Sequence, residues 1–335
     1  MKSDERWTDA TVEAIEDLSP TVRGLRLRPA GGVPPFTVGA HLRVRLAVDG
    51  RSELRHYSLV GLPAEMRADG CYRIAVKRAD PGRGGSRAMW RLQPGQRLAI
   101  AGPDNHFELP AAAPHTLLVA GGIGITPILG MALALAARGA SMRLCYAARD
   151  DGELVFVDRL RAALGERLAT FSDARDQRLD LGAEIAALPA GAQMLICGPV
   201  PLLQATQAAW SKAGRPAAGL RFETFGSSGN RPAEPFRVRL PRHGLDFVVP
   251  ADRSLLDVLT EQGVDVLSEC RRGECGLCAV DVLELQGEID HRDVFLGAEE
   301  KRANRQLCAC VSRVCGGGVV LDSAYRPDAL HAKAA

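Results

Sequence analysis

The feature that most constrains this chain is a loop of closely spaced cysteines, Cys270 to Cys278, with the sequence CRRGECGLC. Its C-x4-C-x2-C spacing brings three thiols together, and three more cysteines follow at Cys308, Cys310 and Cys315. A chain of 335 residues can bury sizeable cores, so it does not need disulfides as staples. The loop is therefore expected to fold around something that binds sulfur.

Three cysteines with this spacing and one distant cysteine are typical of a plant-type 2Fe–2S cluster. Gly273 and Gly276 permit the unusual dihedrals of such a loop, and its backbone N–H groups, with Arg271 and Arg272, would offset thiolate charge. A structural zinc site usually shows two C-x2-C pairs, and only one is present. The predicted cluster ligands from this loop are Cys270, Cys275 and Cys278.

The fourth ligand stays open when only spacing is considered. Cys308, Cys310 and Cys315 follow Cys278 after 29, 31 and 36 residues. Cys308 and Cys310 lie two residues apart at an expected strand end, so we expect their side chains to point to opposite faces, with only one facing the cluster.

Composition excludes several classes of protein. The formal net charge of +2 is too small to indicate binding to nucleic acid or to a membrane surface. The segment MKSDERWTDATVEAIED lacks the apolar region of a signal peptide, and no run of about 18 apolar residues suggests a transmembrane helix. We expect a cytoplasmic protein, in which thiols stay reduced.

Up to about residue 110 the chain shows short segments of alternating apolar and polar residues. They are TVRGLRLRP, HLRVRLAV, RHYSLVG, CYRIAVKR and QRLAIAGP, with Gly and Pro between them. This pattern predicts an antiparallel β-barrel.

From about residue 114 to 225 strands alternate with helices. HTLLVAGG, MRLCYAAR and AQMLICGP read as strands, and TPILGMALALAARG, DGELVFVDRLRAALG and VPLLQATQAAWSKAG as helices. Pro127 stands near the first turn of one helix and Gly139 at its end. Such alternation predicts a parallel sheet in an α/β domain.

Two features of this region suggest a phosphate site. Gly121, Gly122 and Gly124 lie between a buried strand and a helix start, where a pyrophosphate can approach the backbone, although a tight turn would have the same composition. The segment CGP, Cys197 to Pro199, ends a later strand, and ligands of open α/β sheets bind outside such ends.

The third region begins after GSSGNRPAEP, whose composition is that of a linker. FRVRLPRHGLDFVVP reads as a hairpin with Gly244 in its turn, and SLLDVLTEQG as a helix with a Ser N-cap. We predict a multi-domain chain with an antiparallel β-barrel domain (1–110), an α/β parallel-sheet domain (111–226), a linker (227–235), an α+β plant-type ferredoxin domain (236–325) and a tail (326–335).

The barrel region carries a second group of candidate ligand contacts. In RHYSL, Arg55 could pair with a phosphate, Tyr57 could stack on an aromatic ring, and Ser58 could hydrogen-bond a ring heteroatom. GRGGS, residues 82–86, offers a cradle of backbone N–H groups. The alternative is that Tyr57 belongs to the barrel core and GRGGS is a flexible turn.

Taken in order, these motifs resemble the phthalate dioxygenase reductase family, within the ferredoxin–NAD(P) reductase superfamily. The resemblance runs from about Trp7 to Asp322 and rests on RHYSL, IAVKR with GRGGS, GPDNHFEL, VAGGIGITPIL, CGP, RFETF, CRRGECGLC, GEIDHRD and CVSR. It implies an FMN-binding barrel, an NAD-binding domain and a ferredoxin domain. It also implies that hydride passes from NADH to the flavin, and single electrons then pass through the cluster to a Rieske-type non-haem iron oxygenase. We expect a monomer.

The resemblance implies roles for individual residues. Flavin contacts fall to Arg55, His56, Tyr57, Ser58, Ala75, Val76, Lys77, Gly84, Gly85 and Ser86. Nucleotide contacts fall to Gly121, Gly122, Gly124, Pro127, Arg149, Cys197, Gly198 and Pro199. Thr126 contacts the flavin or the nicotinamide, and Phe225 closes over the flavin region with Glu223. The expected contributors to hydride transfer are Ser58, Thr126, Cys197 and Glu223.

The family pattern also bears on the fourth ligand, because its last cluster cysteine immediately precedes VSR. That position is Cys310 here, while Cys308 and Cys315 are additional and the spacing is long for the family. Three alternatives stay open: FAD in place of FMN; NADPH in place of NADH, with Arg149 available for its 2′-phosphate; and a ligand swap to Cys308. Rival functions are a stand-alone flavin-dependent reductase and a non-catalytic redox sensor that uses the surplus cysteines.

Overall fold

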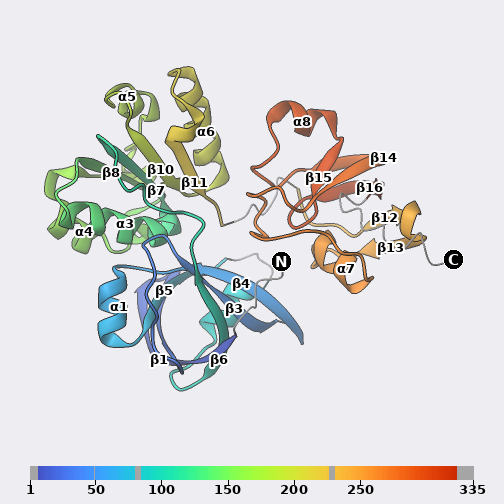
Figure 1. The fold of residues 1–335 in the computed structure, drawn as a ribbon, viewed down its shortest axis with the longest axis horizontal. Coiled ribbons are helices and arrows are strands. Elements are labelled where there is room, and N and C mark those ends of the chain that lie inside the picture. Colours follow the sequence, from blue (N-terminus) through green and yellow to red (C-terminus); the bar gives the residue numbers. More distant parts are fainter. Residues whose placement is uncertain (1–6, 49, 80–83, 226–230, 323–335) are drawn as a thin grey trace. The chain divides into compact units, whose positions relative to one another are not determined.

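The computed structural model describes residues 7–48, 50–79, 84–225 and 231–322, which form two compact units, Met1–Glu223 and Thr224–Ala335 (Figure 1). The first unit contains two sheets and the second contains one. Among the described residues, no helix is long and apolar enough to cross a membrane.

The first sheet is antiparallel, as the alternation predicted, with strand order β4-β3-β6-β1-β2-β5. A bridge between Leu59 and Ile74 links the two edges of this sheet, so it curls toward a barrel. Its inward side chains form a core that includes Leu27, Leu42 and Ile100. Its strands are β1 (Thr8–Ser19), β2 (Val22–Pro29), β3 (His41–Val48), β4 (Arg51–Ser58), β5 (Tyr72–Lys77) and β6 (Arg97–Asp104), with the short helices α1 (Pro63–Asp69) and α2 (Gly85–Trp90).

The second sheet is parallel, with strand order β11-β10-β7-β8-β9, which confirms the predicted α/β architecture. Helices α3 and α4 pack together, as do α5 and α6, and Figure 1 shows the two pairs on opposite faces of the sheet. Its strands are β7 (Thr116–Gly121), β8 (Met142–Ala148), β9 (Leu168–Ser172), β10 (Gln193–Cys197) and β11 (Leu220–Glu223). Its helices are α3 (Ile125–Ala137), α4 (Val157–Leu164), α5 (Leu181–Ala186) and α6 (Val200–Lys212), with the 3₁₀ turns η1 (Gly122–Gly124), η2 (Asp151–Glu153), η3 (Gly165–Arg167), η4 (Asp173–Arg175) and η5 (Ala217–Gly219).

Two helix predictions in this sheet had different outcomes. Pro127 lies in the first turn of α3 and Gly139 follows its end with a φ of 66°, as predicted. The single helix predicted over DGELVFVDRLRAALG is wrong at its start, because Phe156 has a φ of 65° and separates η2 from α4. A left-handed residue at that position cannot continue a right-handed helix.

The second unit has one mixed sheet with strand order β13-β12-β16-β14-β15. Gly244 forms the predicted hairpin turn with a φ of 64°, and the Ser254 side chain accepts from the Asp257 N–H at the start of α7. The β14–β16 pairing shifts register twice, as it does at a β-bulge. The elements are β12 (Phe236–Leu240), η6 (Pro241–His243), β13 (Leu245–Val249), α7 (Leu255–Glu261), β14 (Ala279–Asp290), α8 (Ala298–Ala303), β15 (Gln306–Cys308) and β16 (Arg313–Asp322).

The predicted domain limits remain predictions. The limit near residue 110 falls between β6 and β7, inside one compact unit. Of the predicted linker, residues 231–235 are described and contain no helix or strand, while 226–230 and the predicted tail 326–335 lie outside the described residues.

Candidate functional site

The cysteine loop folds around the sulfur of Cys270. Backbone N–H groups of Arg272, Glu274 and Cys275 donate to Cys270 Sγ over 3.4, 3.3 and 3.4 Å. Gly273 and Gly276 have φ values of 77° and 73°, in the left-handed region that favours glycine. The loop therefore has the geometry expected of a thiolate-binding loop, with its N–H groups turned toward sulfur.

The sulfurs lie in two groups. The Cys275 thiol is the main cause that lowers the pKa of Cys270 to about 5, with burial opposing and backbone N–H groups assisting. The thiols of Cys308 and Cys310 are the main causes that lower the pKa of Cys278 to about 3. A cluster with two irons and four thiolates requires two ligands for each iron, so pairing Cys270 with Cys275 and Cys278 with a later cysteine fits that group.

The expectation that Cys308 and Cys310 face opposite sides is wrong, because both thiols contact Cys278. Strand alternation does not apply, since β15 ends at Cys308 and a turn follows, closed by the Ser312 N–H on the Cys308 carbonyl at 3.0 Å. Cys315 stands apart on β16 opposite Glu288, and the charges acting on its pKa come from Asp290 and other charged side chains, not from cysteines.

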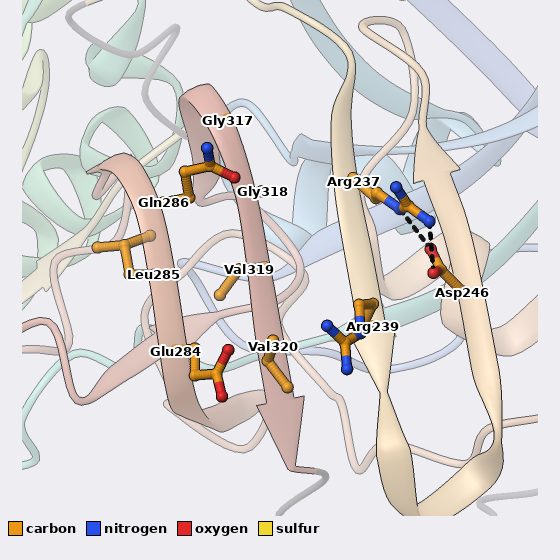
Figure 2. Close-up of a pocket in the computed structure, with 10 residues that line it drawn as sticks. All are labelled: Arg237, Arg239, Asp246, Glu284, Leu285, Gln286, Gly317, Gly318, Val319 and Val320. Carbon is orange, nitrogen blue, oxygen red and sulfur yellow. Dashed lines mark hydrogen bonds and ion pairs between the residues drawn. The ribbon is translucent and has the colours of Figure 1, made fainter.

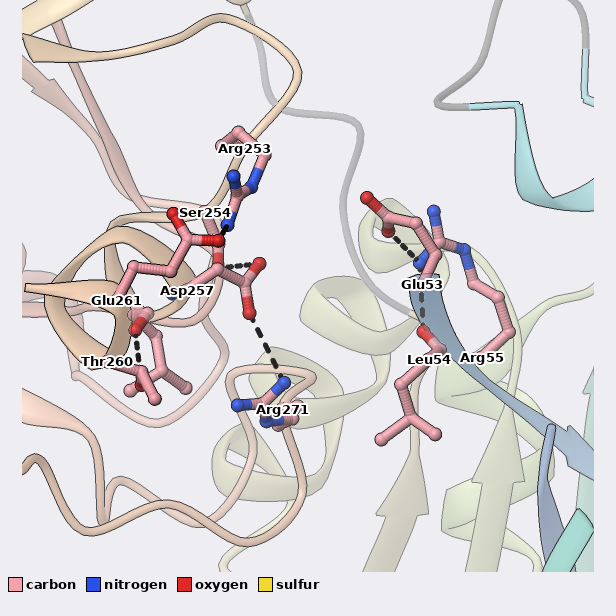
Figure 3. Close-up of polar contacts among 10 residues, drawn as sticks. Glu53, Leu54, Arg55, Arg253, Ser254, Asp257, Thr260, Glu261 and Arg271 are labelled. Atoms are coloured by element: carbon pink, nitrogen blue, oxygen red, sulfur yellow. Dashed lines mark hydrogen bonds and ion pairs between the residues drawn. The ribbon is translucent and has the colours of Figure 1, made fainter. Parts of the chain in front are cut away.

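The loop arginines pair with carboxylates of their own unit. Arg271 Nη1 donates to Asp257 Oδ1 over 3.2 Å, beside the Ser254 cap of α7 (Figure 3). Arg272 is buried, with its Nη2 3.3 Å from Glu274 Oε2. The arginines therefore offset carboxylate charge as well as any thiolate charge in the loop.

In the described part of the chain, no three histidine, cysteine or acidic side chains gather as ligands of a single metal ion. The cysteines of the second unit occur instead as the two groups described above, and Cys278, Cys308 and Cys310 belong to its buried core.

In the first unit, Arg55 meets the start of α2. Its Nη1 donates to Glu53 Oε2 over 2.6 Å and to the Leu54 carbonyl over 2.8 Å (Figure 3). A Cβ at Gly85 would lie only 2.4 Å from Arg55 Nε, so a larger residue there would push the Arg55 side chain aside. Gly84 has a φ of 79°, and Arg55 therefore lies against the Gly84–Gly85 turn that was predicted to bind phosphate.

Ser58 at the end of β4 donates to Glu223 at the end of β11 over 3.3 Å, and both side chains are buried. Glu223 pairs in the parallel sheet with Cys197, the last residue of β10. A Cβ at Gly124 would lie 2.1 Å from the Cys197 carbonyl oxygen, so η1 lies directly on this strand end. Residues predicted to act in hydride transfer thus meet at the carboxyl edge of the parallel sheet.

The other glycine-rich contacts lie at the same edge. A Cβ at Gly121 would be 2.7 Å from Pro199 Cδ and 3.3 Å from Gly198 Cα. Thr126 is buried, and its hydroxyl donates to the Ile123 carbonyl over 2.9 Å. Gly122 has a φ of 51° in η1, and Pro127 lies in the first turn of α3.

The remaining predicted ligand contacts lie on several different elements. Ala75 and Val76 are buried in β5. Lys77 pairs with Glu153 at 2.5 Å, and Arg149 is exposed just after β8. Tyr57 is partly buried, and burial raises its pKa. The His56 ring lies 5.1 Å from that of His41, the Ser86 hydroxyl accepts the Ala79 N–H at 3.1 Å, and Phe225, just past the boundary of the first unit, is 40% exposed.

Sequence reasoning missed several polar partners of these sites: Glu53, Glu153, Glu274 and Asp293. Two of them lie in or beside quoted motifs, Glu274 inside CRRGECGLC and Asp293 at the end of GEIDHRD. Glu53 stands two residues before RHYSL and Glu153 lies in DGELVFVDRLRAALG, but neither local pattern indicates which cation the carboxylate meets.

Two hollows lie apart from the predicted ligands. A groove of about 560 Å³ crosses the sheet of the second unit and contains the Arg237–Asp246 ion pair (Figure 2). The other, about 370 Å³, is lined by Asn105, Phe107 and Arg221 among others in the first unit. None of the predicted cysteines or flavin contacts lines either hollow.

Comparison with known families matches both ends of the chain. Residues 239–315 match the family described as "2Fe-2S iron-sulfur cluster binding domain". Residues 9–109 match the "Oxidoreductase FAD-binding domain". These assignments support a 2Fe–2S cluster in the second unit and a flavin on the antiparallel sheet.

Individual relatives extend the likeness to nearly the whole chain. The heme-dependent oxidative N-demethylase beta subunit of Ectopseudomonas mendocina (strain ymp) is 39% identical over 94% of this chain and 98% of its own. The phthalate 4,5-dioxygenase oxygenase reductase subunit of Pseudomonas putida is 36% identical over 95% and 98%.

A solved structure agrees with both relatives. Phthalate dioxygenase reductase, described as a modular structure for electron transfer from pyridine nucleotides to [2Fe-2S], superposes with a TM-score of 0.78 at 34% identity, over 94% of this chain and 98% of its own. The chain therefore belongs to the phthalate dioxygenase reductase family of oxidoreductases.

Proposed function

We propose that this chain is the reductase component of an oxygenase system, taking electrons from NADH through FMN and a 2Fe–2S cluster to a Rieske-type oxygenase. The observation that carries the proposal is the pairing of Cys270 with Cys275 and of Cys278 with a later cysteine. A flavin reductase of small acceptors needs no such cluster, so the cysteines favour a protein acceptor of single electrons.

When bound, the flavin supplies the conversion of a two-electron hydride donor into single electrons, and the cluster passes those electrons on. The side chains position these groups. In this proposal Ser58 and Thr126 border the flavin ring, and Cys197 and Glu223 border the nicotinamide. The buried contact between Ser58 and Glu223 supports a shared site, because it joins a barrel strand end to the sheet edge.

The contact between Arg55 and the Gly84–Gly85 turn supports FMN as the flavin, in place of FAD. FMN ends in a phosphate, which a guanidinium and the N–H groups of Gly84, Gly85 and Ser86 would bind together. NADH would lie along Gly121, Gly122, Gly124, Gly198 and Pro199, at the carboxyl edge where parallel sheets bind ligands. Arg149 is exposed after β8, where it would meet the ribose of the nucleotide.

A haem-dependent acceptor is the second candidate, because the relative with 39% identity is the beta subunit of a heme-dependent oxidative N-demethylase. The two candidates share the same path within this chain and differ only in the protein that receives the electrons. The acceptor, not the reductase, must therefore be identified by experiment.

The test is reconstitution with the oxygenase encoded nearest to this chain. Flavin released from the purified protein should chromatograph as FMN, and NADH should be oxidised faster than NADPH. Product formation should require both components, and the oxygenase should give the electron paramagnetic resonance spectrum of a Rieske centre once it is reduced. A haem spectrum would select the second candidate, and turnover of the oxygenase without this chain would contradict both.

The Arg55→Ala variant should lose most of its flavin during purification, because the proposed phosphate site loses the guanidinium that lies against Gly85. The measurement is the ratio of released flavin to protein after denaturation. The matched control is Arg28→Ala, since Arg28 is exposed and pairs with Glu13 elsewhere on the same sheet. Equal flavin content in Arg55→Ala and the unaltered protein would contradict the assignment.

A further inference from the structure

Asp293 is a buried carboxylate that the electron path described so far does not use. It follows β14 in the GEIDHRD motif, and its side chain is 0% exposed. A buried carboxyl group without partners would become protonated, so Asp293 stays ionised only if hydrogen bonds and cations surround it. The partners of this carboxylate come from several segments.

One oxygen of Asp293 faces the segment that carries the last cysteines. Oδ1 accepts the Ser312 hydroxyl over 3.1 Å, and Ser312 in turn closes the turn after Cys308. Ser312 also accepts the Arg292 N–H over 3.3 Å. Through Ser312, Asp293 therefore fixes the turn in which Cys310 lies.

The backbone of Asp293 faces the three-cysteine loop. A Cβ at Gly273 would lie 2.8 Å from Asp293 Cα, and the Gly273 carbonyl accepts the Val294 N–H over 2.9 Å. Gly273 lies between Cys270 and Cys275 in the sequence. Asp293 is thus packed between the two cysteine-bearing segments and touches both.

The carboxylate is held in its ionised form. Burial acts to raise the pKa of Asp293, but the nearby His291 ring, hydrogen bonds from the Leu296 N–H and the Ser312 hydroxyl, and the charge of Lys301 bring it below its usual value. Lys301 Nζ lies 3.6 Å from Oδ2. The charge of Asp293 is one hydrogen bond, through Ser312, from the turn that carries Cys308 and Cys310, so its field reaches the cysteines.

We propose that Asp293 is a positioning residue of the cluster site, which holds the two cysteine-bearing segments together and lowers the reduction potential of the 2Fe–2S cluster by its buried negative charge. This inference rests on the cysteine assignment, although not on NADH, FMN or the acceptor. A fixed negative charge disfavours addition of an electron nearby, and charge and hydrogen bonding around a cluster set its potential.

The test compares Asp293→Asn with the unaltered full-length protein. Asparagine keeps the size of the side chain and removes the charge. The cluster should be reduced more easily, with an equilibrium constant on the order of tenfold higher, which corresponds to about 59 mV for one electron. Spectroelectrochemistry measures the shift, and iron and sulfide per chain show whether the cluster is retained. Asp246→Asn is the control, since Asp246 pairs with exposed Arg237.

A second variant covers the case in which Asp293→Asn does not assemble a cluster. Lys301→Met removes the cation beside Asp293 Oδ2, so the negative charge of Asp293 is no longer partly neutralised. The reduction potential of the cluster should therefore fall, whereas Asp293→Asn should raise it. Opposite shifts in the two variants, or a negative shift in Lys301→Met alone, support the proposal. The proposal is overturned if Asp293→Asn contains a full cluster and its reduction potential is unchanged. If Asp293→Asn contains no cluster, an unchanged reduction potential in Lys301→Met overturns it.

Discussion

The Cys310→Ser variant should contain no 2Fe–2S cluster, whereas Cys308→Ser should keep it. Cys310 lies next to Cys278 through both its thiol and its backbone N–H. It is also the cysteine that immediately precedes VSR. Serine offers a harder oxygen ligand, which suits iron–sulfur clusters poorly compared with thiolate. Iron and acid-labile sulfide per chain, with the visible absorbance of the cluster, measure the outcome.

This pair of variants separates two thiols that the structure places side by side. Cys308 is wholly buried at the end of β15, paired with Ala279, and so can be a neighbour of the cluster without being its ligand. Cys315→Ser is the matched control, because Cys315 is buried in the same unit away from the other sulfurs. Loss of the cluster in Cys308→Ser with retention in Cys310→Ser would reverse the assignment.

The Gly124→Ala variant should bind NADH at least tenfold more weakly and lose stability. The added Cβ would lie 2.1 Å from the Cys197 carbonyl oxygen and 2.9 Å from the Gly198 nitrogen. Both are backbone atoms, so no flexible side chain can move aside, and η1 must shift off the strand end. Overpacking of this kind destabilises by about 1–3 kcal/mol. The measurements are the KM for NADH and the free energy of unfolding.

Alanine variants at two other glycines serve as controls that separate an effect on nucleotide binding from an effect on stability. A Cβ at Gly130 in α3 would lie 2.5 Å from the Gly61 carbonyl oxygen, away from the strand end, so Gly130→Ala should lose stability and keep its KM. A Cβ at Gly31 would meet nothing within 4 Å, so Gly31→Ala should change neither quantity. An unchanged KM in Gly124→Ala would refute the placement of the nucleotide at η1.

Local patterns predicted the sheets well and the long-range contacts poorly. The cysteine spacing, the strand alternation and the glycine turn are each encoded within a few neighbouring residues, and all three appear where expected. The contact between Ser58 and Glu223 joins residues 165 positions apart and could not be found from either segment alone. It depends on how the two sheets of the first unit pack.

Three errors have physical causes. Strand β1 was not predicted, because TDATVEAIEDLS is rich in charge and mostly half-exposed, with two register shifts that interrupt its alternation. The helix predicted over DGELVFVDRLRAALG begins later than expected because Phe156 has a left-handed φ, which is unusual for an aromatic residue. The prediction that Cys308 and Cys310 face opposite sides failed because the strand ends at Cys308, two residues before Cys310.

The most direct test of electron flow is anaerobic rapid mixing of the cofactor-loaded protein with NADH, followed by absorbance. Flavin absorbance should fall first and cluster absorbance afterwards, and Cys310→Ser should show only the first phase. A flavin that NADH does not bleach, or a cluster that stays oxidised beside a fully bleached flavin, would contradict the proposed path.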